Sequence, residues 1–201
     1  MSIPVYKIQL SETRQAADTL YRAFQDDPMF MWFCDGPSKY EQVALALIET
    51  WVRYCVLYGF AYRTENFEAV ALRKKLGDTK LSFWRMYRSG ILKTRKILGP
   101  AGLKRMILLN KLLRKAATTN MHDQPYLYCW LLGTLPNKQR QGYGGALMKE
   151  TFTLATRDNL PCYLEASVRA VKTHEHNGYR ELSRVKLPES DIELVCMRRE
   201  P

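Results

Sequence analysis

The sequence predicts an α/β fold in which strands and helices alternate along 201 residues. Three observations favour this fold class. Several segments carry apolar residues at every third or fourth position, as amphipathic helices do. Others are short apolar runs bounded by turn residues, as buried strands are. One such run, YLYCWLLGTL at 126–135, leads through a glycine-rich turn into a further helical segment. Together they indicate a single domain over 1–201 with mostly sequential packing.

Residues 5–72 predict a strand, two helices and a pair of strands. In chain order these elements are expected at 5–10, about 12–24, 40–57, 60–64 and 68–72. Ser11 can cap the first helix and the sequence Asp26-Asp27-Pro28 stops it, so a loop is expected at 26–32. Gly59 ends the second helix, and a tight turn at 65–67 joins the two strands.

The segment from Arg73 to Lys115 concentrates the positive charge. It holds 14 basic residues and one acid, Asp78, which gives it a net charge of +13 in a chain whose net charge is +11. Two amphipathic helices separated at Gly99-Pro100 are expected over about 73–119. They could form a lid with solvated basic side chains, a basic rim that attracts an anionic ligand, or a surface for nucleic acid or an anionic membrane. The lid is favoured, and nucleic acid is not expected as a partner.

The last part of the chain predicts a buried strand followed by alternating helices and strands. Strands are expected at 126–135, 161–166, 179–187 and 192–198, and helices at 144–158 and 169–177. The first strand is apolar at nearly every position, which is typical of a strand covered on both faces. Gly178 is the expected C-cap of the short helix, because glycine readily adopts a left-handed conformation.

The turn after the buried strand carries the most informative motif. Its glycines lie at 142, 144 and 145, where the next helix begins. Free backbone N–H groups at a helix N-terminus bind anions, and glycine lets a pyrophosphate approach the backbone closely. The spacing fits neither the dinucleotide motif GxGxxG nor the Walker A loop. It does fit Q/R-x-x-G-x-G/A, although a plain glycine turn that caps a helix is the alternative.

On this motif the sequence resembles the GNAT superfamily of N-acetyltransferases. Further motifs are similar to the branch that contains puromycin N-acetyltransferase, namely AFQDDPMFMWF, LPCYLEAS, HEHNGY and the terminal CMRREP. The resemblance covers roughly residues 14–200 and is weakest in the basic segment. It implies the GNAT fold, an α/β sandwich whose mixed sheet splays open where the strand at 132–134 parts from the strand at 163–166.

The resemblance also implies acetyl-CoA as the acetyl donor and no metal. The strand end would offer backbone groups to the pantetheine arm, and the turn would cradle the pyrophosphate. The implied pantetheine-binding residues are Leu132, Gly133 and Thr134, and the implied pyrophosphate-binding residues are Gln139, Arg140, Gln141, Gly142, Tyr143, Gly144 and Gly145.

Two residues are candidates for catalysis. Glu165 occupies the position of a carboxylate that in this branch helps to deprotonate the amine, because only a neutral amine attacks a thioester. A structural strand-end carboxylate is the alternative. His174 stands where related enzymes usually carry a tyrosine that protonates the leaving thiolate. An imidazolium could do the same, or His174 could be an idle replacement. Ala170 replaces a usual asparagine, so one side-chain contact to the coenzyme is expected to be missing.

The expected reaction is direct transfer of acetyl from acetyl-CoA to a primary amine of a small molecule in a ternary complex. The alternatives are acetylation of a protein or peptide amine, and a non-catalytic acyl-CoA-binding protein, which the residues His174 and Ala170 suggest. The five cysteines are scattered without a CxxC pair, and neither a leader peptide nor an apolar run of membrane-spanning length is evident. A cytoplasmic protein with reduced thiols is expected. A homodimer is compatible with the sequence, which identifies neither the oligomeric state nor the amine.

Overall fold

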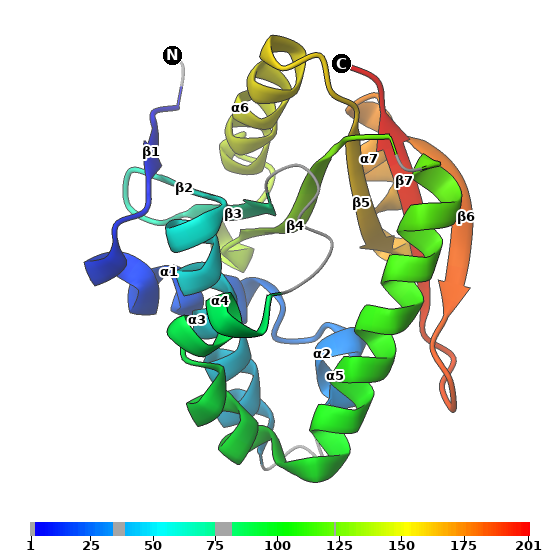
Figure 1. Cartoon of the computed structure of the whole chain (residues 1–201). Helices are drawn as coiled ribbons and strands as arrows, with labels where there is room; N and C mark the ends of the chain where they lie inside the picture. Colours follow the sequence, from blue (N-terminus) through cyan, green and yellow to red (C-terminus); the bar gives the residue numbers. More distant parts are fainter. Residues whose placement is uncertain (1–2, 34–38, 75–81, 123) are drawn as a thin grey trace.

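A mixed β-sheet forms the centre of the computed structural model, which describes residues 3–33, 39–74, 82–122 and 124–201 (Figure 1). Within these residues seven strands run in the order β1-β2-β3-β4-β5-β7-β6. They are β1 (Val5–Lys7), β2 (Phe60–Thr64), β3 (Ala69–Lys74), β4 (Leu127–Thr134), β5 (Cys162–Ser167), β6 (Arg180–Lys186) and β7 (Glu193–Arg199). Strands β4 and β5 are parallel, and the other neighbours are antiparallel. The predicted α/β class with a mixed sheet is confirmed.

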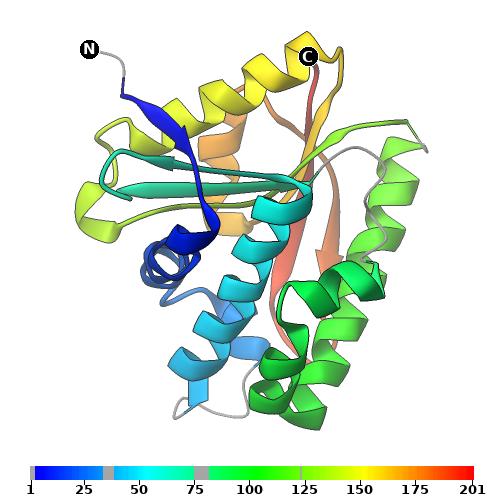
Figure 2. The same cartoon turned by 60° about the vertical axis from the view of Figure 1, so that its left-hand side comes forward.

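Helices cover both faces of this sheet. They are α1 (Thr13–Ala23), α2 (Pro28–Phe33), α3 (Tyr40–Tyr58), α4 (Phe83–Arg88), α5 (Ile91–Met121), α6 (Tyr143–Arg157) and α7 (Val171–His176). Helix α6 lies over one face of β2, β3 and β4, whereas α1 and α3 pack on the opposite face (Figure 2). The long helix α5 runs beside β6 and β7, and its opposite end contacts α2 (Figure 1).

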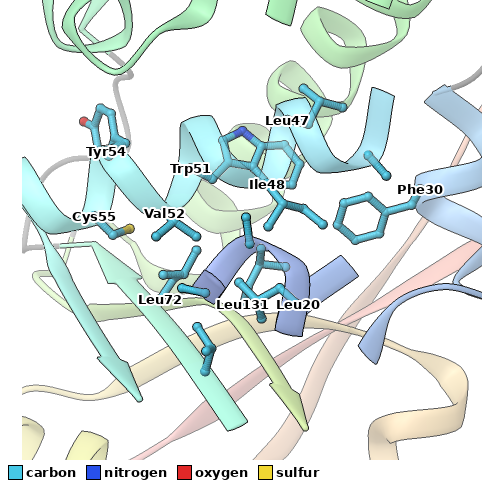
Figure 3. Packing of buried hydrophobic residues seen from close by; sticks show 14 of the residues in the cluster. Leu20, Phe30, Leu47, Ile48, Trp51, Val52, Tyr54, Cys55, Leu72 and Leu131 are labelled. Carbon is cyan, nitrogen blue, oxygen red and sulfur yellow. The ribbon is translucent and has the colours of Figure 1, made fainter. Parts of the chain in front are cut away.

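The largest hydrophobic core lies between α1, α3 and the sheet. Leu20 of α1 and Ile48 of α3 point toward Leu72 of β3 and Leu131 of β4, and all four side chains are fully or nearly fully buried (Figure 3). Close-packed aliphatic side chains of this kind tolerate little shift. This core therefore holds β4 in one register, which matters because β4 forms one wall of the candidate site.

Strands β4 and β5 pair over only two positions and then separate. The paired residues are Leu127 with Cys162 and Tyr128 with Tyr163. Just beyond them β4 carries a bulge at Trp130, because its neighbours Cys129 and Leu131 lie opposite the consecutive residues Arg73 and Leu72 of β3. This separation confirms the predicted splay of the sheet, and it opens a gap between the two strands.

The start of the chain differs from the prediction. Strand β1 ends at Lys7, and residues 10–12 form a 3₁₀ turn before α1 begins at Thr13. Ser11 was the predicted cap, but α1 follows Glu12 without any side-chain cap. The Glu12 carboxylate instead accepts a hydrogen bond of 2.8 Å from the backbone N–H of Gln9, which begins the 3₁₀ turn. Arg63 holds the same carboxylate at 2.6 Å, which fixes its orientation.

The predicted loop at 26–32 contains a helix instead. Helix α2 begins at Pro28, and Asp27 Oδ1 accepts a hydrogen bond of 2.9 Å from the backbone N–H of Met29. Proline is well tolerated in the first turn of a helix, since the N–H that it lacks would have no partner there. The sequence Asp26-Asp27-Pro28 therefore separates two helices and also starts the second.

The basic segment is not a pair of exposed helices throughout. Arg73 and Lys74 belong to β3 and are only 2% and 6% exposed, and residues 75–81 lie outside the described part of the chain. The first predicted helix is interrupted at Gly90, whose φ of 96° is left-handed, so α4 ends before α5 begins. Gly99 has a φ of 70° and kinks α5 at the predicted break before Pro100, without a connecting loop.

Candidate active site

A cavity passes through the gap between β4 and β5 and is lined from both faces of the sheet. Glu165 faces the same side as Tyr163, two residues earlier on β5, which packs against the end of α5. His174 lies on the opposite side, where its ring contacts Tyr179 at 5.5 Å between centroids in the core beneath α6. The predicted residues Glu165 and His174 therefore meet in one cavity from opposite faces.

Glu165 is held by a short hydrogen bond. The hydroxyl of Tyr128 donates to its Oε2 at 2.6 Å, while its Oε1 is buried and has no hydrogen-bond partner among the described residues. Burial raises the pKa of the Glu165 carboxyl to about 7, although the Tyr128 hydroxyl and the positive charge of Lys74 oppose this shift. A carboxyl with this pKa can gain and lose a proton near neutral pH, as a general base must.

Lys74 supplies buried positive charge on the same side of the cavity. Its Nζ lies 3.7 Å from the ring centroid of Trp130 and 5.1 Å from that of Tyr128. Contacts between a cation and an aromatic face are attractive, and they strengthen when water is excluded. The aromatic side chains of β4 thus hold Lys74 where its charge favours ionised Glu165.

The environment of His174 weakens its predicted role as an imidazolium acid. Its Nδ1 is buried and has no hydrogen-bond partner among the described residues. Burial lowers the pKa of His174 below its ordinary value, so the neutral imidazole predominates at neutral pH. A neutral ring can still donate one N–H hydrogen bond. His176, the neighbouring histidine, is exposed on α7.

The glycine turn has the geometry of an anion site. Gly142 takes a left-handed φ of 89° and starts α6 without any side-chain cap. A Cβ atom on Gly144 would approach Thr134 Oγ1 to 3.1 Å, whereas one on Gly145 would meet nothing within 4 Å. The first N–H groups of α6 have no partner within the helix. Uncapped amides beside open space at Gly145 fit a pyrophosphate.

Not every predicted coenzyme residue points to a ligand. Gln139 Nε2 lies 3.4 Å from the carbonyl of Thr134, and Gln141 Nε2 donates to the carbonyl of Asn137 at 3.0 Å. These side chains therefore brace the turn.

Gly133 packs against α1, since a Cβ there would lie 2.7 Å from Ala23 Cβ. Leu132 lines the cavity. Arg140 has a left-handed φ of 59°, and Tyr143 packs against the core beneath α6.

The side of the cavity that faces α2 and α5 is largely apolar and aromatic. Its lining residues include Phe24, Met29, Trp51, Met86, Met106, Leu109, Leu113, Tyr126 and Trp130. Asp27 also lines the cavity, and burial raises the pKa of its carboxyl. These residues come from α2, α3, α4, α5 and β4 and from the segments next to α1 and β4, so no single local pattern predicts the lining as a whole. Asp27 belongs to the predicted loop at 26–32, and Lys74 to the predicted basic segment.

The described ranges contain neither a cluster of metal ligands nor a membrane-spanning helix. No three His, Cys, Asp or Glu side chains there are grouped closely enough to hold a metal ion. No helix in those ranges combines the length and the apolar character needed to cross a bilayer.

Comparisons with known proteins point in one direction. No protein-family model matches the sequence. An uncharacterized N-acetyltransferase of Schizosaccharomyces pombe is 24% identical over 205 residues, which cover 97% of this chain and 82% of the relative. The sequence likeness thus extends along nearly the whole chain.

Solved acetyltransferases share the fold. A Corynebacterium glutamicum structure described as histone acetyltransferase HPA2 and related acetyltransferase has a TM-score of 0.68 at 19% identity, covering 100% of this chain and 97% of that one. A mosquito protein described as arylalkylamine N-acetyltransferase like 5b has a TM-score of 0.61 at 16% identity. The Drosophila melanogaster polyamine N-acetyltransferase, which forms N-acetylagmatine, has a TM-score of 0.64 at 12% identity. Each of these two matches covers 100% of this chain and 100% of the chain in the solved structure. The splayed mixed sheet of this chain is therefore the GNAT acetyltransferase fold.

Proposed function

We propose that this chain is a GNAT N-acetyltransferase that transfers acetyl from acetyl-CoA to the primary amine of a small molecule with an apolar body. The single observation that carries the proposal is the cavity through the β4–β5 gap, which is lined by Met148 and Thr151 of α6 on one face of the sheet and opens on the other face into an aromatic chamber that contains Glu165. The motifs quoted above favour the branch of puromycin N-acetyltransferase, and the scattered cysteines without a CxxC pair favour a cytoplasmic location.

The glycine turn holds the coenzyme in this proposal. The amides of Tyr143, Gly144 and Gly145 bind the pyrophosphate, and the end of β4 at Leu132–Thr134 lies along the pantetheine arm. Acetyl-CoA, when bound, supplies an activated acetyl group as a thioester. The gap between β4 and β5 lets the two substrates meet inside the sheet, and holding them together supplies much of the acceleration.

Glu165 prepares the amine. Its carboxylate accepts a proton from the ammonium form of the acceptor, because only the free amine has a lone pair for attack. Tyr128 and Lys74 keep enough of Glu165 ionised near pH 7 for this transfer. His174, on the opposite face, donates an N–H hydrogen bond to the departing sulfur as a neutral ring. That role is weaker than full protonation by an imidazolium.

The substrate class follows from the chamber. Aromatic and aliphatic side chains from α2, α3, α4, α5 and β4 favour an amine with an aromatic or aliphatic body. The carboxyls of Glu165 and Asp27 are suited to an ammonium group. The structural neighbours include arylalkylamine N-acetyltransferase 2 of Aedes aegypti and the Drosophila melanogaster polyamine N-acetyltransferase. An extended protein segment would have to pass α2 and α5, which cover this side.

Calorimetric titration with acetyl-CoA tests the coenzyme site. We expect the wild type to bind in the micromolar range and Gly145→Asp to lose at least about tenfold in affinity, because a carboxylate repels the pyrophosphate. Open space around Gly145 lets the variant fold. Ala101→Asp places the same charge on an exposed position of α5 and should bind like the wild type. A folded wild type that does not bind acetyl-CoA would refute the proposal.

An acceptor panel then tests the substrate class. Release of coenzyme A thiol is measured with phenethylamine, with agmatine and with a lysine-containing peptide. We expect the highest kcat/KM for phenethylamine. Preference for the peptide would favour the protein acetyltransferase alternative. Tight coenzyme binding without turnover of any amine would favour a non-catalytic acyl-CoA-binding protein.

A further inference from the structure

The cavity contains a cysteine thiol that the proposed acetyl transfer does not use. Cys129 lies on β4 directly after the last position paired with β5, where the gap begins. It is half-buried, whereas Cys55, Cys162 and Cys196 are buried. Its Sγ lies 3.5 Å from the hydroxyl of Tyr179, which lines the same cavity. Among the described cysteines, Cys129 is therefore the one within reach of a ligand in the gap.

A buried arginine stands beside this thiol. Arg73 is the direct neighbour of Cys129 across the β3–β4 pair and is only 2% exposed. Its Nη2 donates to the carbonyl of Leu147 on α6, whereas its Nη1 is buried and has no hydrogen-bond partner among the described residues. The guanidinium is thus held by the sheet and α6, with unused hydrogen-bonding capacity next to the gap.

These neighbours favour the ionised form of one thiol. A hydrogen bond with Cys162, the charge of Arg73 and a hydrogen bond with Tyr179 lower the pKa of Cys129 below that of an ordinary thiol, and burial opposes them. The pKa of Cys162 shifts in the opposite direction, because its hydrogen bond with Cys129 and its burial both raise it. A thiolate, and not a thiol, is the nucleophile in exchange with a disulfide.

We propose that Cys129 is a covalent modification site that forms a mixed disulfide with coenzyme A inside the β4–β5 gap. The inference rests on the proposed coenzyme site, because the glycine turn would hold the nucleotide part of the reagent and bring its sulfur to Cys129. The oxidant is coenzyme A disulfide. The Cys129 thiolate attacks one sulfur, the S–S bond of the reagent breaks, the protein–coenzyme S–S bond forms, and one coenzyme A leaves as thiolate.

The modification would act as a reversible redox switch. The attached coenzyme fills the gap that acetyl-CoA needs, so the modified protein cannot take up the donor. A small thiol reverses the exchange and frees Cys129. Neither direction requires unfolding, because Cys129 already lines the cavity.

Intact-mass measurement and peptide mapping test the proposal in a Cys34→Ser parent, which removes the cysteine that lies outside the described residues. The parent is incubated with coenzyme A disulfide or, separately, with glutathione disulfide. We expect one coenzyme A per chain, mapped to Cys129, removed by dithiothreitol and absent when Cys129→Ser is added. Modification by glutathione disulfide should be at least about tenfold slower, because nothing in the site holds that reagent.

Two further arms separate this inference from the proposed function. Gly145→Asp in the parent should slow the reaction with coenzyme A disulfide and leave that with glutathione disulfide unchanged. Calorimetry on the parent measures acetyl-CoA binding independently. Binding without an adduct at Cys129 would overturn the modification site and leave the acetyltransferase proposal intact. Equal rates with both disulfides, or an adduct only on a buried cysteine, would also overturn it. Loss of acetyl-CoA binding in a folded parent would overturn the proposed function itself.

Discussion

The hydroxyl of Tyr128 donates a 2.6 Å hydrogen bond to Oε2 of Glu165 across the point where β4 and β5 begin to separate. Tyr128 is the last residue of β4 that pairs with β5, so the hydrogen bond that stabilises ionised Glu165 spans the two strands where they begin to separate. Burial raises the pKa of Glu165 to about 7, and the Tyr128 hydrogen bond is the largest influence that opposes this rise. This pair sets the pH range in which Glu165 can serve as a base.

The first prediction concerns the pH dependence of turnover. A protonated Glu165 cannot accept a proton, so kcat/KM should rise with pH through an apparent pKa near 7. Tyr128→Phe removes a hydrogen bond that stabilises the carboxylate, so this limb should move to higher pH. Glu165→Gln should lower the rate by about 100-fold or more and abolish the limb. Measuring the pH dependence of kcat/KM with two amines of different pKa distinguishes the ionisation of Glu165 from the ionisation of the substrate. A limb that moves only with the amine would contradict the role.

The second prediction concerns stability. The folded state holds a proton on Glu165 more tightly than the unfolded chain, because its pKa is raised from 4.5 to about 7. The free energy of unfolding should therefore contain a contribution that is present below pH 4.5 and is lost as pH rises to 7, on the order of 3 kcal/mol. Urea unfolding of wild type and Glu165→Gln at pH 5 and pH 8 measures it. Relative to wild type, Glu165→Gln should be more stable at pH 8 than at pH 5. If the difference in free energy of unfolding between the two proteins is the same at both pH values, the raised pKa of Glu165 is contradicted.

Much of the fold could be predicted because its patterns are local. The run at 126–135 and the glycines at 142, 144 and 145 identify a buried strand followed by an anion-binding helix start. The starts and ends of most elements agree with the structure to within a few residues. The break at Gly90 was missed because glycine is tolerated within helical patterns, and its left-handed φ appears only in the structure.

The lining of the site could not be predicted in the same way. Arg73 and Lys74 look like the first residues of a basic surface segment, yet they are buried at the end of β3. Their burial depends on Leu147, Trp130 and Tyr128, which are more than 50 residues away. Contacts of this kind follow from the register of β3 on β4 and from the position of α6, which no local pattern encodes.

The third prediction separates the two interpretations of His174. As a neutral donor of one hydrogen bond, His174 contributes about 0.5–1.5 kcal/mol, so His174→Phe should lower kcat by about tenfold or less. Acetyl-CoA binding should change little, and calorimetry checks this. His176→Phe on the exposed face of α7 is the matched control and should leave kcat unchanged. A loss of more than about 100-fold would identify an imidazolium acid in spite of the lowered pKa.

The fourth prediction tests which glycine serves the fold. Gly133→Ala would place a Cβ 2.7 Å from Ala23 Cβ and 3.0 Å from Leu20 Cδ2, so α1 or β4 must shift. We expect the free energy of unfolding to fall by about 1–3 kcal/mol. Gly145→Ala adds a methyl group to open space in the first turn of α6 and should leave the stability equal or up to about 1 kcal/mol higher. Urea unfolding of both variants measures the two changes. Equal losses of stability would contradict the expectation that Gly133, and not Gly145, is required for packing.

The last prediction asks whether α5 forms the wall of the acceptor chamber. Leu112 and Leu113 are adjacent on α5 and are both partly buried, but only Leu113 lines the cavity. Leu113→Asn places an amide against the apolar body of the amine, so the KM for phenethylamine should rise about fivefold to tenfold. Acetyl-CoA affinity should not change, because the proposed coenzyme contacts come from the glycine turn and the end of β4 and not from α5. Leu112→Asn introduces the same polarity on the neighbouring position and should leave KM unaltered. Equal effects of the two variants would mean that α5 acts on activity through general stability and not as a wall of the substrate site.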